Sequence, residues 1–296
     1  MNQENDTKDF IDELRKSAFS VLLLDYDGTL APFSLDRDVA VPYPGVRAVL
    51  QNIADSGRTR IVILTGRDAT QIGPLLRVDP APEVWGAHGL QRLLPSGNNE
   101  LPELDAHATH ALANAERWLA YQGFLGLAER KPGSLAVHWR GLDQSFAAAL
   151  RNKIIRGWSA LARKYPFRIL EFDGGLEFRL ETRDKAFAIR TILRETSPDS
   201  PVAYLGDDFT DEPAFRVLRH RGLTILVRKY RRPTSAQTWL KPPEELLEFL
   251  SSWRDATRKP HSDDSPSVHP AQAKGSYLDN AYDRHQPKPR RRNAVA

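Results

Sequence analysis

The 296-residue sequence contains no cysteine. Without cysteine the chain has no disulfide framework, no thiolate metal site and no cysteine nucleophile. It also lacks any apolar run close to the roughly 20 residues of a membrane-spanning helix, and no stretch resembles a signal peptide. We therefore expect a cytoplasmic protein without a membrane partner.

An excess of one charge sign is also missing, except near the C-terminus. The chain has 42 Lys and Arg against 38 Asp and Glu, a formal net charge of +4. Residues 256–296 hold eight of the basic and four of the acidic residues, so residues 1–255 are neutral. That terminal stretch is rich in Pro, Ser and charge, which is typical of disorder. We predict a disordered basic tail at 256–296, interpret its Arg290–Arg292 cluster as a solvated terminus, and expect no nucleic-acid partner.

The sequence does contain enough apolar residues, 41% of the chain, for a substantial core. One apolar run, Val21–Leu24, leads directly into Asp25, Asp27 and Gly28. A short apolar run closed by Asp and Gly predicts a buried parallel strand that ends in a loop. Ligands of open α/β sheets bind at such strand ends, and two carboxylates aimed into one site favour a hard cation such as Mg²⁺. The alternative is an ordinary Asp-Gly turn.

Strands alternate with helices in the first 104 residues and again after residue 181. The pattern predicts a leading helix within 1–19, strands at 20–25, 60–64, 84–85 and 202–205, and helices at 45–55, 68–76, 184–195 and 243–253. This alternation is typical of βαβ units and a parallel sheet.

The pattern of predicted helices and strands differs between residues 105 and 180. Here the pattern predicts helices at 106–121 and 146–164, strand material within 125–140, and a hairpin of 167–172 with 175–180. We therefore predict an N-terminal segment (1–19), a Rossmann-like α/β core (20–104 and 181–255), an inserted α+β domain (105–180) and the tail (256–296).

Three charged residues have the chemistry for phosphoryl transfer. Asp25 could attack phosphorus as a carboxylate nucleophile and form an aspartyl-phosphate. Asp27 could protonate the leaving oxygen and later activate water. Lys185, where the chain re-enters the core, could neutralise charge on the nucleophile and the phosphate. Taken alone, Lys185 would be read as a solvated helix residue.

Two further groups also follow predicted strands. The hydroxyl of Thr65 and the open backbone of Gly66 could hold phosphoryl oxygens, although such a pair is more often an ordinary loop. Asp207 and Asp208 could complete the metal site, or could cap the helix that follows. Phosphoryl transfer needs mainly positioning and electrostatic stabilisation, which this set supplies.

The order of these motifs resembles that of the haloacid-dehalogenase (HAD) superfamily of phosphatases, and the insertion looks like the C2-type cap of that superfamily. Within it, the chain is most similar to the trehalose-6-phosphate phosphatase family. The likeness spans about residues 21–253 and is carried by Gly86-x-His88-Gly89, Glu129-Arg130-Lys131, Leu135–Arg140, Glu177-Phe178-Arg179 and Gly206–Glu212. Two positions depart from the family pattern: Leu180 stands where Pro is common, and Ala186 stands where Gly is common. Both differences affect the shape of the backbone and not the chemistry.

The resemblance implies a Mg²⁺-dependent phosphatase that hydrolyses trehalose 6-phosphate. It makes Asp25 the nucleophile and a metal ligand, and Asp27 the acid/base and a ligand through its backbone carbonyl. Asp207 becomes the third ligand, with Asp208 or Asp211 at or behind the metal. The metal set is thus Asp25, Asp27, Asp207 and Asp208. The substrate-binding set is Asp25, Tyr26, Asp27, Thr65, Gly66, Arg67, Glu129, Lys131, His138, Arg140, Glu177 and Lys185, of which Glu129, Lys131 and Glu177 would grip the sugar hydroxyls.

Several alternatives stay open at this point. The substrate could instead be sucrose-phosphate, mannosylglycerate-phosphate or glucosylglycerol-phosphate. A dehalogenase is disfavoured, because it would not need the second aspartate, Asp27. The chain could also be a non-catalytic phosphosugar sensor or a regulatory subunit of a synthase, and even as an enzyme it could be functionally coupled to a trehalose-phosphate synthase. Finally, Glu129 and Lys131 could form an exposed charge pair on a strand.

Overall fold

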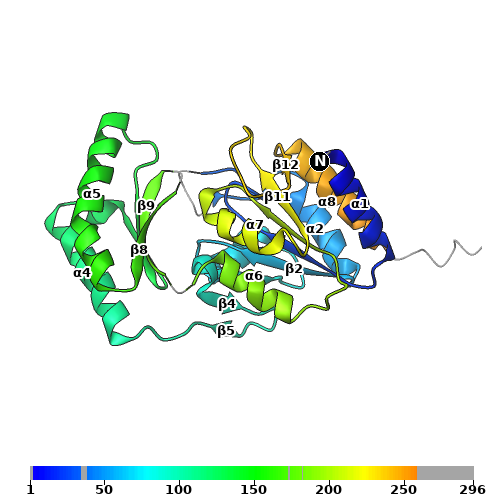
Figure 1. Ribbon diagram of the computed structural model, residues 1–296, viewed down its shortest axis with the longest axis horizontal. Helices are drawn as coiled ribbons and strands as arrows, with labels where there is room; N and C mark the ends of the chain where they lie inside the picture. Colours follow the sequence, from blue (N-terminus) through cyan, green and yellow to red (C-terminus); the bar gives the residue numbers. More distant parts are fainter. Residues whose placement is uncertain (1–2, 35–38, 173, 182, 259–296) are drawn as a thin grey trace, which may run out of the picture. The chain divides into compact units, whose positions relative to one another are not determined.

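The computed structural model describes residues 3–34, 39–172, 174–181 and 183–258 (Figure 1). Residues 259–296, which make up most of the predicted tail, lie outside the described residues. Within the described ranges, no helix combines the length and the apolarity needed to cross a membrane.

The core is built on an eight-stranded sheet in the order β12-β11-β10-β1-β2-β3-β4-β5. The strands from β12 to β3 are parallel, and β4 and β5 continue the sheet in antiparallel fashion. Their bounds are β1 (Ser20–Leu24), β2 (Thr59–Leu64), β3 (Glu83–Gly86), β4 (Gln91–Leu93), β5 (Asn99–Glu100), β10 (Val202–Gly206), β11 (Leu223–Val227) and β12 (Thr238–Leu240).

Helices cover both faces of this sheet (Figure 1). They are α1 (Gln3–Lys16), α2 (Val46–Asp55), α3 (Ile72–Leu76), α6 (Lys185–Arg194), α7 (Glu212–Leu218) and α8 (Glu244–Thr257). Leu22 and Leu24 of β1 pack with α1, α2 and α8, whereas Val21 and Leu23 pack with α6 and α7. Alternate side chains of a strand point to opposite faces, so this continuous apolar strand is buried on both sides.

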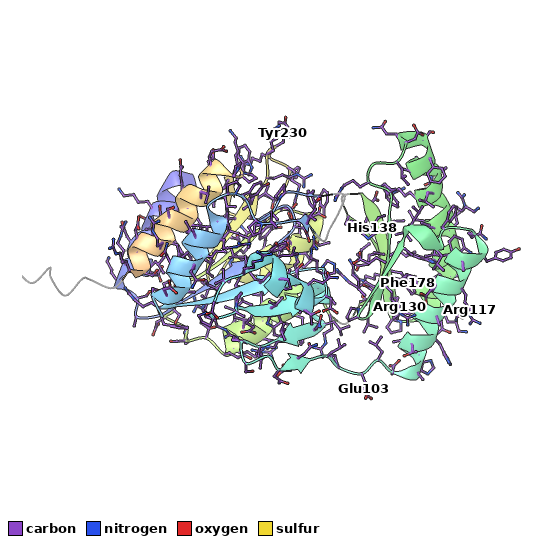
Figure 2. The ribbon with its side chains drawn as sticks, turned by 180° about the vertical axis from the view of Figure 1, so that it is seen from behind. Glu103, Arg117, Arg130, His138, Phe178 and Tyr230 are labelled. Carbon is purple, nitrogen blue, oxygen red and sulfur yellow. The ribbon has the colours of Figure 1, made fainter. Side chains whose placement is uncertain are left out.

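The part of the chain between β5 and α6, which was predicted to be an inserted domain, has its own antiparallel sheet in the order β6-β7-β9-β8. Its elements are α4 (Ala106–Tyr121), β6 (Ala128–Lys131), β7 (Ser134–His138), α5 (Gln144–Lys164), β8 (Phe167–Phe172) and β9 (Gly175–Leu180). One face of the sheet, with Val137 and Phe178, packs on the two helices around Trp158. Figure 2 labels Phe178 and also His138, which lies on the cavity side of the sheet. We call this domain the cap.

The two sheets confirm the predicted fold class, an α/β core with an inserted α+β layer. Five elements were not predicted: β4, β5, β11, β12 and α7. Of these, β4 and β5 are short and largely polar, so their apolar signal is weak. In contrast, β11 (Leu223–Val227) is apolar and fully buried, and it was not predicted although its signal is clear. The predicted helix 68–76 is split into a 3₁₀ turn, Ala69–Gln71, and α3. The last helix continues to Thr257 because Ala256 and Thr257 are buried against the core.

Candidate active site

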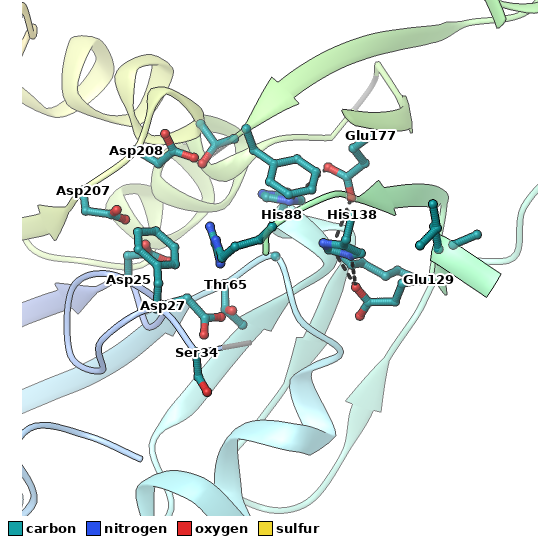
Figure 3. Close-up of a pocket in the computed structure, with 18 of the residues that line it drawn as sticks. Asp25, Asp27, Ser34, Thr65, His88, Glu129, His138, Glu177, Asp207 and Asp208 are labelled. Atoms are coloured by element: carbon teal, nitrogen blue, oxygen red, sulfur yellow. Dashed lines mark hydrogen bonds and ion pairs between the residues drawn. The ribbon is translucent and has the colours of Figure 1, made fainter. Parts of the chain in front are cut away.

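A cavity of about 480 Å³ lies at the carboxyl ends of the central strands, lined by residues of both the core and the cap (Figure 3). Asp25 follows β1, Thr65 follows β2 and Asp207 follows β10. These three strands are neighbours in the sheet, and parallel neighbours end at the same edge. The structure therefore brings the three residues into one cavity, whose size suits a small molecule.

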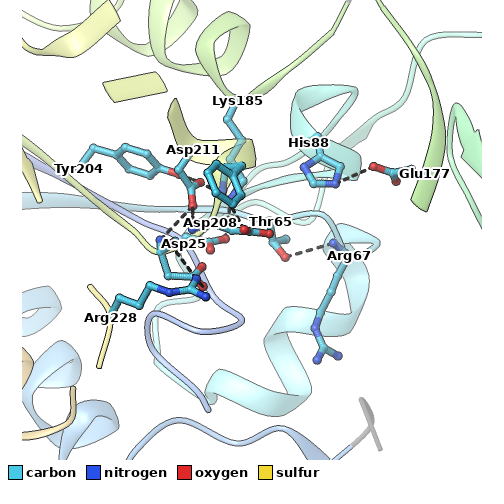
Figure 4. Close-up of polar contacts among 12 residues, drawn as sticks. Asp25, Thr65, Arg67, His88, Glu177, Lys185, Tyr204, Asp208, Asp211 and Arg228 are labelled. Carbon is cyan, nitrogen blue, oxygen red and sulfur yellow. Dashed lines mark hydrogen bonds and ion pairs between the residues drawn. The ribbon is translucent and has the colours of Figure 1, made fainter. Parts of the chain in front are cut away.

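Lys185, the first residue of α6, joins two buried carboxylates. Its Nζ donates to Asp25 Oδ1 at 2.7 Å and to Asp211 Oδ1 at 2.6 Å (Figure 4). Burial alone would lower the pKa of Lys185, but Asp211 and Asp25 raise it above its ordinary value. Burial raises the pKa of Asp25 to about 7, against the lowering effect of Lys185. Lys185 is therefore a fixed positive charge beside the predicted nucleophile.

Asp211 has a structural role in the loop that follows β10. Its Oδ2 accepts the backbone N–H groups of Asp207 and Asp208, both at 2.9 Å, and its Oδ1 accepts from Lys185 and from the Tyr204 hydroxyl. Burial would raise the pKa of Asp211, but Lys185 and these hydrogen bonds hold it below its usual range. A carboxylate with four donors is already satisfied, so Asp211 lies behind the site and fixes the loop.

The carboxylate of Asp207 differs from that of Asp211 in its hydrogen bonding. Both of its carboxylate oxygens are buried and have no hydrogen-bond partner among the described residues. Burial, then Asp25 and Asp211, raise the pKa of Asp207 well above its usual range. One oxygen each of Asp25, Asp207 and Asp211 lie within 4.8 Å of one another. Arg228 Nη1 lies 3.9 Å from Asp207 Oδ2, too far for a hydrogen bond. Carboxylate oxygens gathered in this way, those of Asp207 without a hydrogen bond, fit a hard divalent cation such as Mg²⁺.

Asp208, predicted as a metal ligand, has a different contact. Its side chain accepts from Phe209 N at 2.8 Å and forms a capping box with Asp211. Asp208 lines the cavity, but it is not part of the carboxylate cluster formed by Asp25, Asp207 and Asp211. The contacts of Asp208 thus support its alternative role as a helix cap.

Asp27 is held by Arg67 at the cavity wall. Arg67 Nε donates to Asp27 Oδ2 at 2.7 Å and Nη2 donates to Oδ1 at 2.6 Å. The side chain of Arg67 is only 1% exposed, and the hydroxyl of buried Tyr26 donates to Ala40 O. Neither side chain lines the cavity. The side chain of Tyr26 thus contacts the backbone and that of Arg67 contacts Asp27, and the substrate contacts predicted for these two residues stay a prediction.

The cap contributes one face of its sheet to the cavity. Glu129 of β6 lies opposite Ala136 of β7, which lies opposite Glu177 of β9. Residues in such a row share a face, so both carboxylates point away from the helices. Lys131 Nζ lies 3.8 Å from Glu129 Oε2 and 3.5 Å from Glu177 Oε1, and its side chain is only 7% exposed. The alternative of an exposed charge pair is therefore excluded.

Two more predicted residues, His138 and Arg140, line the cavity. His138 Nε2 lies 2.8 Å from Glu129 Oε2 (Figure 3). The Arg140 guanidinium lies 4.4 Å from the centre of the Phe33 ring, a cation–π contact between cap and core.

Several residues that line the cavity were not predicted from the sequence. The apolar ones, Phe33, Leu127, Leu142 and Phe172, carry no signal that separates them from core residues. His88 belongs to the Gly86-x-His88-Gly89 motif, which by itself indicates no role, and its Nε2 lies 3.1 Å from Glu177 Oε2 (Figure 4).

Comparisons with known proteins agree with this geometry. A family model described as trehalose-phosphatase matches residues 23–243. The chain is 30% identical over 263 residues to "Probable trehalose-phosphate phosphatase 4" of Oryza sativa subsp. japonica, covering 82% of this chain and 68% of the rice protein.

Solved structures show the same fold. The C-terminal domain of C. albicans trehalose-6-phosphate phosphatase matches with a TM-score of 0.74 at 19% identity, covering 84% of this chain and 96% of that one. A haloacid dehalogenase-like hydrolase from Bacteroides thetaiotaomicron matches with a TM-score of 0.56 at 14% identity, covering 78% of this chain and 98% of that one.

Gly28 provides a test of the carboxylate cluster. Its φ is +85°, and a Cβ at this position would lie 2.3 Å from Asp207 Oδ2. We expect Gly28→Ala to lower the free energy of unfolding by about 2–3 kcal/mol and the melting temperature by about 5–10 °C. Gly73→Ala is the control, because nothing lies within 4 Å of its Cβ position. Equal melting temperatures for the two variants would contradict the close approach of Gly28 to Asp207.

Proposed function

Because the chain belongs to the trehalose-phosphatase family of the HAD superfamily, we propose that it hydrolyses trehalose 6-phosphate to trehalose and phosphate with Mg²⁺ as cofactor. The observation that carries this proposal is one cavity with two chemically different walls. The core wall holds Asp25, Lys185 and the unpartnered carboxylate of Asp207. The cap wall holds the charged row around Glu129 and Glu177.

The ion would be held by the carboxylates of Asp25 and Asp207 and by the backbone carbonyl of Asp27. The unpartnered oxygens of Asp207 support this assignment, whereas the four donors around Asp211 argue for a role behind the ion. When bound, Mg²⁺ supplies positive charge that stabilises the phosphoryl oxygens during transfer.

The reaction itself runs through residues of this chain. An oxygen of Asp25 attacks phosphorus, and the bond from phosphorus to the sugar oxygen breaks as the aspartyl-phosphate forms. Asp27 gives a proton to the leaving sugar oxygen and then takes one from the water that attacks phosphorus, which releases phosphate and restores Asp25. Lys185 and the Thr65–Gly66 loop hold the charge of the phosphoryl group.

Discrimination among sugar phosphates falls to the cap. The core residues contact the phosphoryl group, which every sugar phosphate shares, so they cannot tell one sugar from another. Glu129, Lys131 and Glu177 can hydrogen-bond several hydroxyls, and a sugar that lacks the matching hydroxyls would leave these groups unpaired. Their positions opposite the core wall support this role.

The nucleophile is tested by Asp25→Asn. The amide cannot form the aspartyl-phosphate, so we expect kcat for trehalose 6-phosphate to fall by at least roughly a thousandfold. A circular dichroism spectrum like that of the wild type would show that the fold is kept. Activity retained within tenfold in a folded variant would rule out Asp25 as the nucleophile.

The substrate is tested by measuring phosphate release from a panel of sugar phosphates and from p-nitrophenyl phosphate, each with Mg²⁺. We expect kcat/KM to be highest for trehalose 6-phosphate. Glu129→Ala should then raise the barrier for this substrate by roughly 1–3 kcal/mol through the lost hydrogen bonds, which lowers the ratio of its kcat/KM to that of the small ester. Glu100→Ala is the control, because Glu100 is an exposed residue of β5 that does not line the cavity.

A panel in which sucrose 6-phosphate or another sugar phosphate is turned over fastest would contradict the trehalose assignment. If Glu129→Ala slowed trehalose 6-phosphate and the small ester equally, the cap residue would have a structural role only.

A further inference from the structure

The backbone of His88 has a strained conformation. It lies in the turn Ala87–Gly89, whose three residues have positive φ angles of 46°, 55° and 103°. A residue with a side chain in this left-handed region costs of order 1–3 kcal/mol and persists only where the surroundings fix it. Such outliers cluster at functional sites, and His88 lines the cavity.

On the core side, the strained turn is attached to the loop that follows β2. His88 N–H donates to Thr65 O at 2.9 Å, and Ala87 N–H donates to Arg67 O at 2.7 Å. The imidazole lies against Gly66, where a Cβ would come within 2.5 Å of Nε2. The ring can therefore occupy this position only because residue 66 is glycine. Backbone and ring together fix His88 to the predicted phosphoryl-binding loop.

On the cap side, His88 reaches Glu177. The two side chains are 10% and 2% exposed, and Nε2 lies 3.1 Å from Oε2. Burial lowers the pKa of His88 to about 4, so the imidazole is neutral near pH 7. Burial alone would raise the pKa of Glu177, but His88, Lys131 and Arg179 hold it well below its usual range. A neutral imidazole beside a carboxylate must donate, so Nε2 carries the proton.

Glu177 in turn organises its neighbours on the cap sheet. Its Oε1 accepts from Ser134 Oγ at 2.8 Å and lies 3.5 Å from Lys131 Nζ. His88 therefore holds the carboxylate on which the position of Lys131 depends. The Nδ1 atom of His88 is buried and has no hydrogen-bond partner among the described residues. Because the Nδ1 atom has no such partner, we infer that the turn orients the imidazole for the contact between Nε2 and Glu177.

We propose that His88 is a positioning residue that fixes Glu177 of the cap against the Thr65–Gly66 loop of the core. The sugar-binding groups and the phosphoryl-binding loop are then presented together at a set separation. This inference rests on the proposed function, because it gives His88 a part in reading the same sugar phosphate. A substrate long enough to span both walls depends on His88, whereas a small ester that ends at the core wall depends on it much less.

The test compares His88→Ala, His88→Asn, Glu177→Gln and the double variant His88→Ala/Glu177→Gln. The substrates are p-nitrophenyl phosphate and the sugar phosphate that the wild type turns over fastest. We expect His88→Ala to raise KM for the sugar phosphate about 10–100-fold, with kcat within about threefold, because the lost positioning weakens ground state and transition state alike. The ratio of the two kcat/KM values should fall at least about tenfold.

Two comparisons separate this role from a merely structural one. Asparagine tolerates the left-handed backbone but is too short to reach Glu177, so His88→Asn should still fold and yet lose selectivity. Arg77→Asn is the matched control, since Arg77 has a φ of 51° and lies outside the cavity; its selectivity should equal that of the wild type. If His88→Ala does not fold, His88→Asn takes its place in every comparison.

The double variant decides whether His88 acts through Glu177. If both belong to one interaction, the double variant should be no worse than the poorer single variant, within about threefold. The proposal would be overturned if the losses in kcat/KM of the two single variants multiplied in the double variant. It would also be overturned if the His88 variants kept the wild-type selectivity. A wild type that prefers another sugar phosphate would contradict the proposed substrate alone, because His88 is then measured on that substrate.

Discussion

Three buried carboxylates share one ammonium group, and the rest of the site depends on this imbalance of charge. Lys185 binds Asp25 and Asp211, while Asp207 has no hydrogen-bond donor among the described residues and only a long ion pair, at 3.9 Å, with Arg228 Nη1. Burial makes the ionised form of a carboxyl costly, which raises the pKa of Asp25 to about 7 and that of Asp207 well above its usual range. Three neighbouring strand ends and the start of α6 bring these groups together. A cation bound between Asp25 and Asp207 would balance the charge.

The order of elements links this charged group to the cap. Glu177 lies in β9, the last strand of the cap, and Lys185 begins α6 only eight residues later. The chain that leaves the cap strand of Glu177 thus leads almost directly to the ammonium group beside Asp25. His88 makes a second link between cap and core, through the loop after β2. The cap face of the cavity and the charged group of the core are therefore joined at two points of the chain.

The sequence predicted the core of this site for a physical reason. Apolar strands followed by polar residues mark the ends of parallel strands, and such ends meet at one edge of the sheet, which identified Asp25, Thr65 and Asp207. The same signal could not tell which acidic residue of a loop faces the ion, and the structure shows Asp211 serving as a satisfied support. It could not show that Arg67 is buried against Asp27. Apolar lining residues such as Phe33 read as ordinary core, and the role of His88 depends on backbone angles that no local pattern reveals.

The central claim is that the cluster of Asp25 and Asp207 is completed by a divalent cation, and calorimetric titration of the wild type and of Asp207→Asn with Mg²⁺ tests it most directly. The wild type should bind one ion and melt at a higher temperature as Mg²⁺ is added, because the ion binds the folded state. Asp207→Asn removes a ligand of the proposed ion, so its melting temperature should respond only weakly to Mg²⁺. A wild type whose melting temperature ignores Mg²⁺, or a variant that binds the ion equally well, would contradict the account.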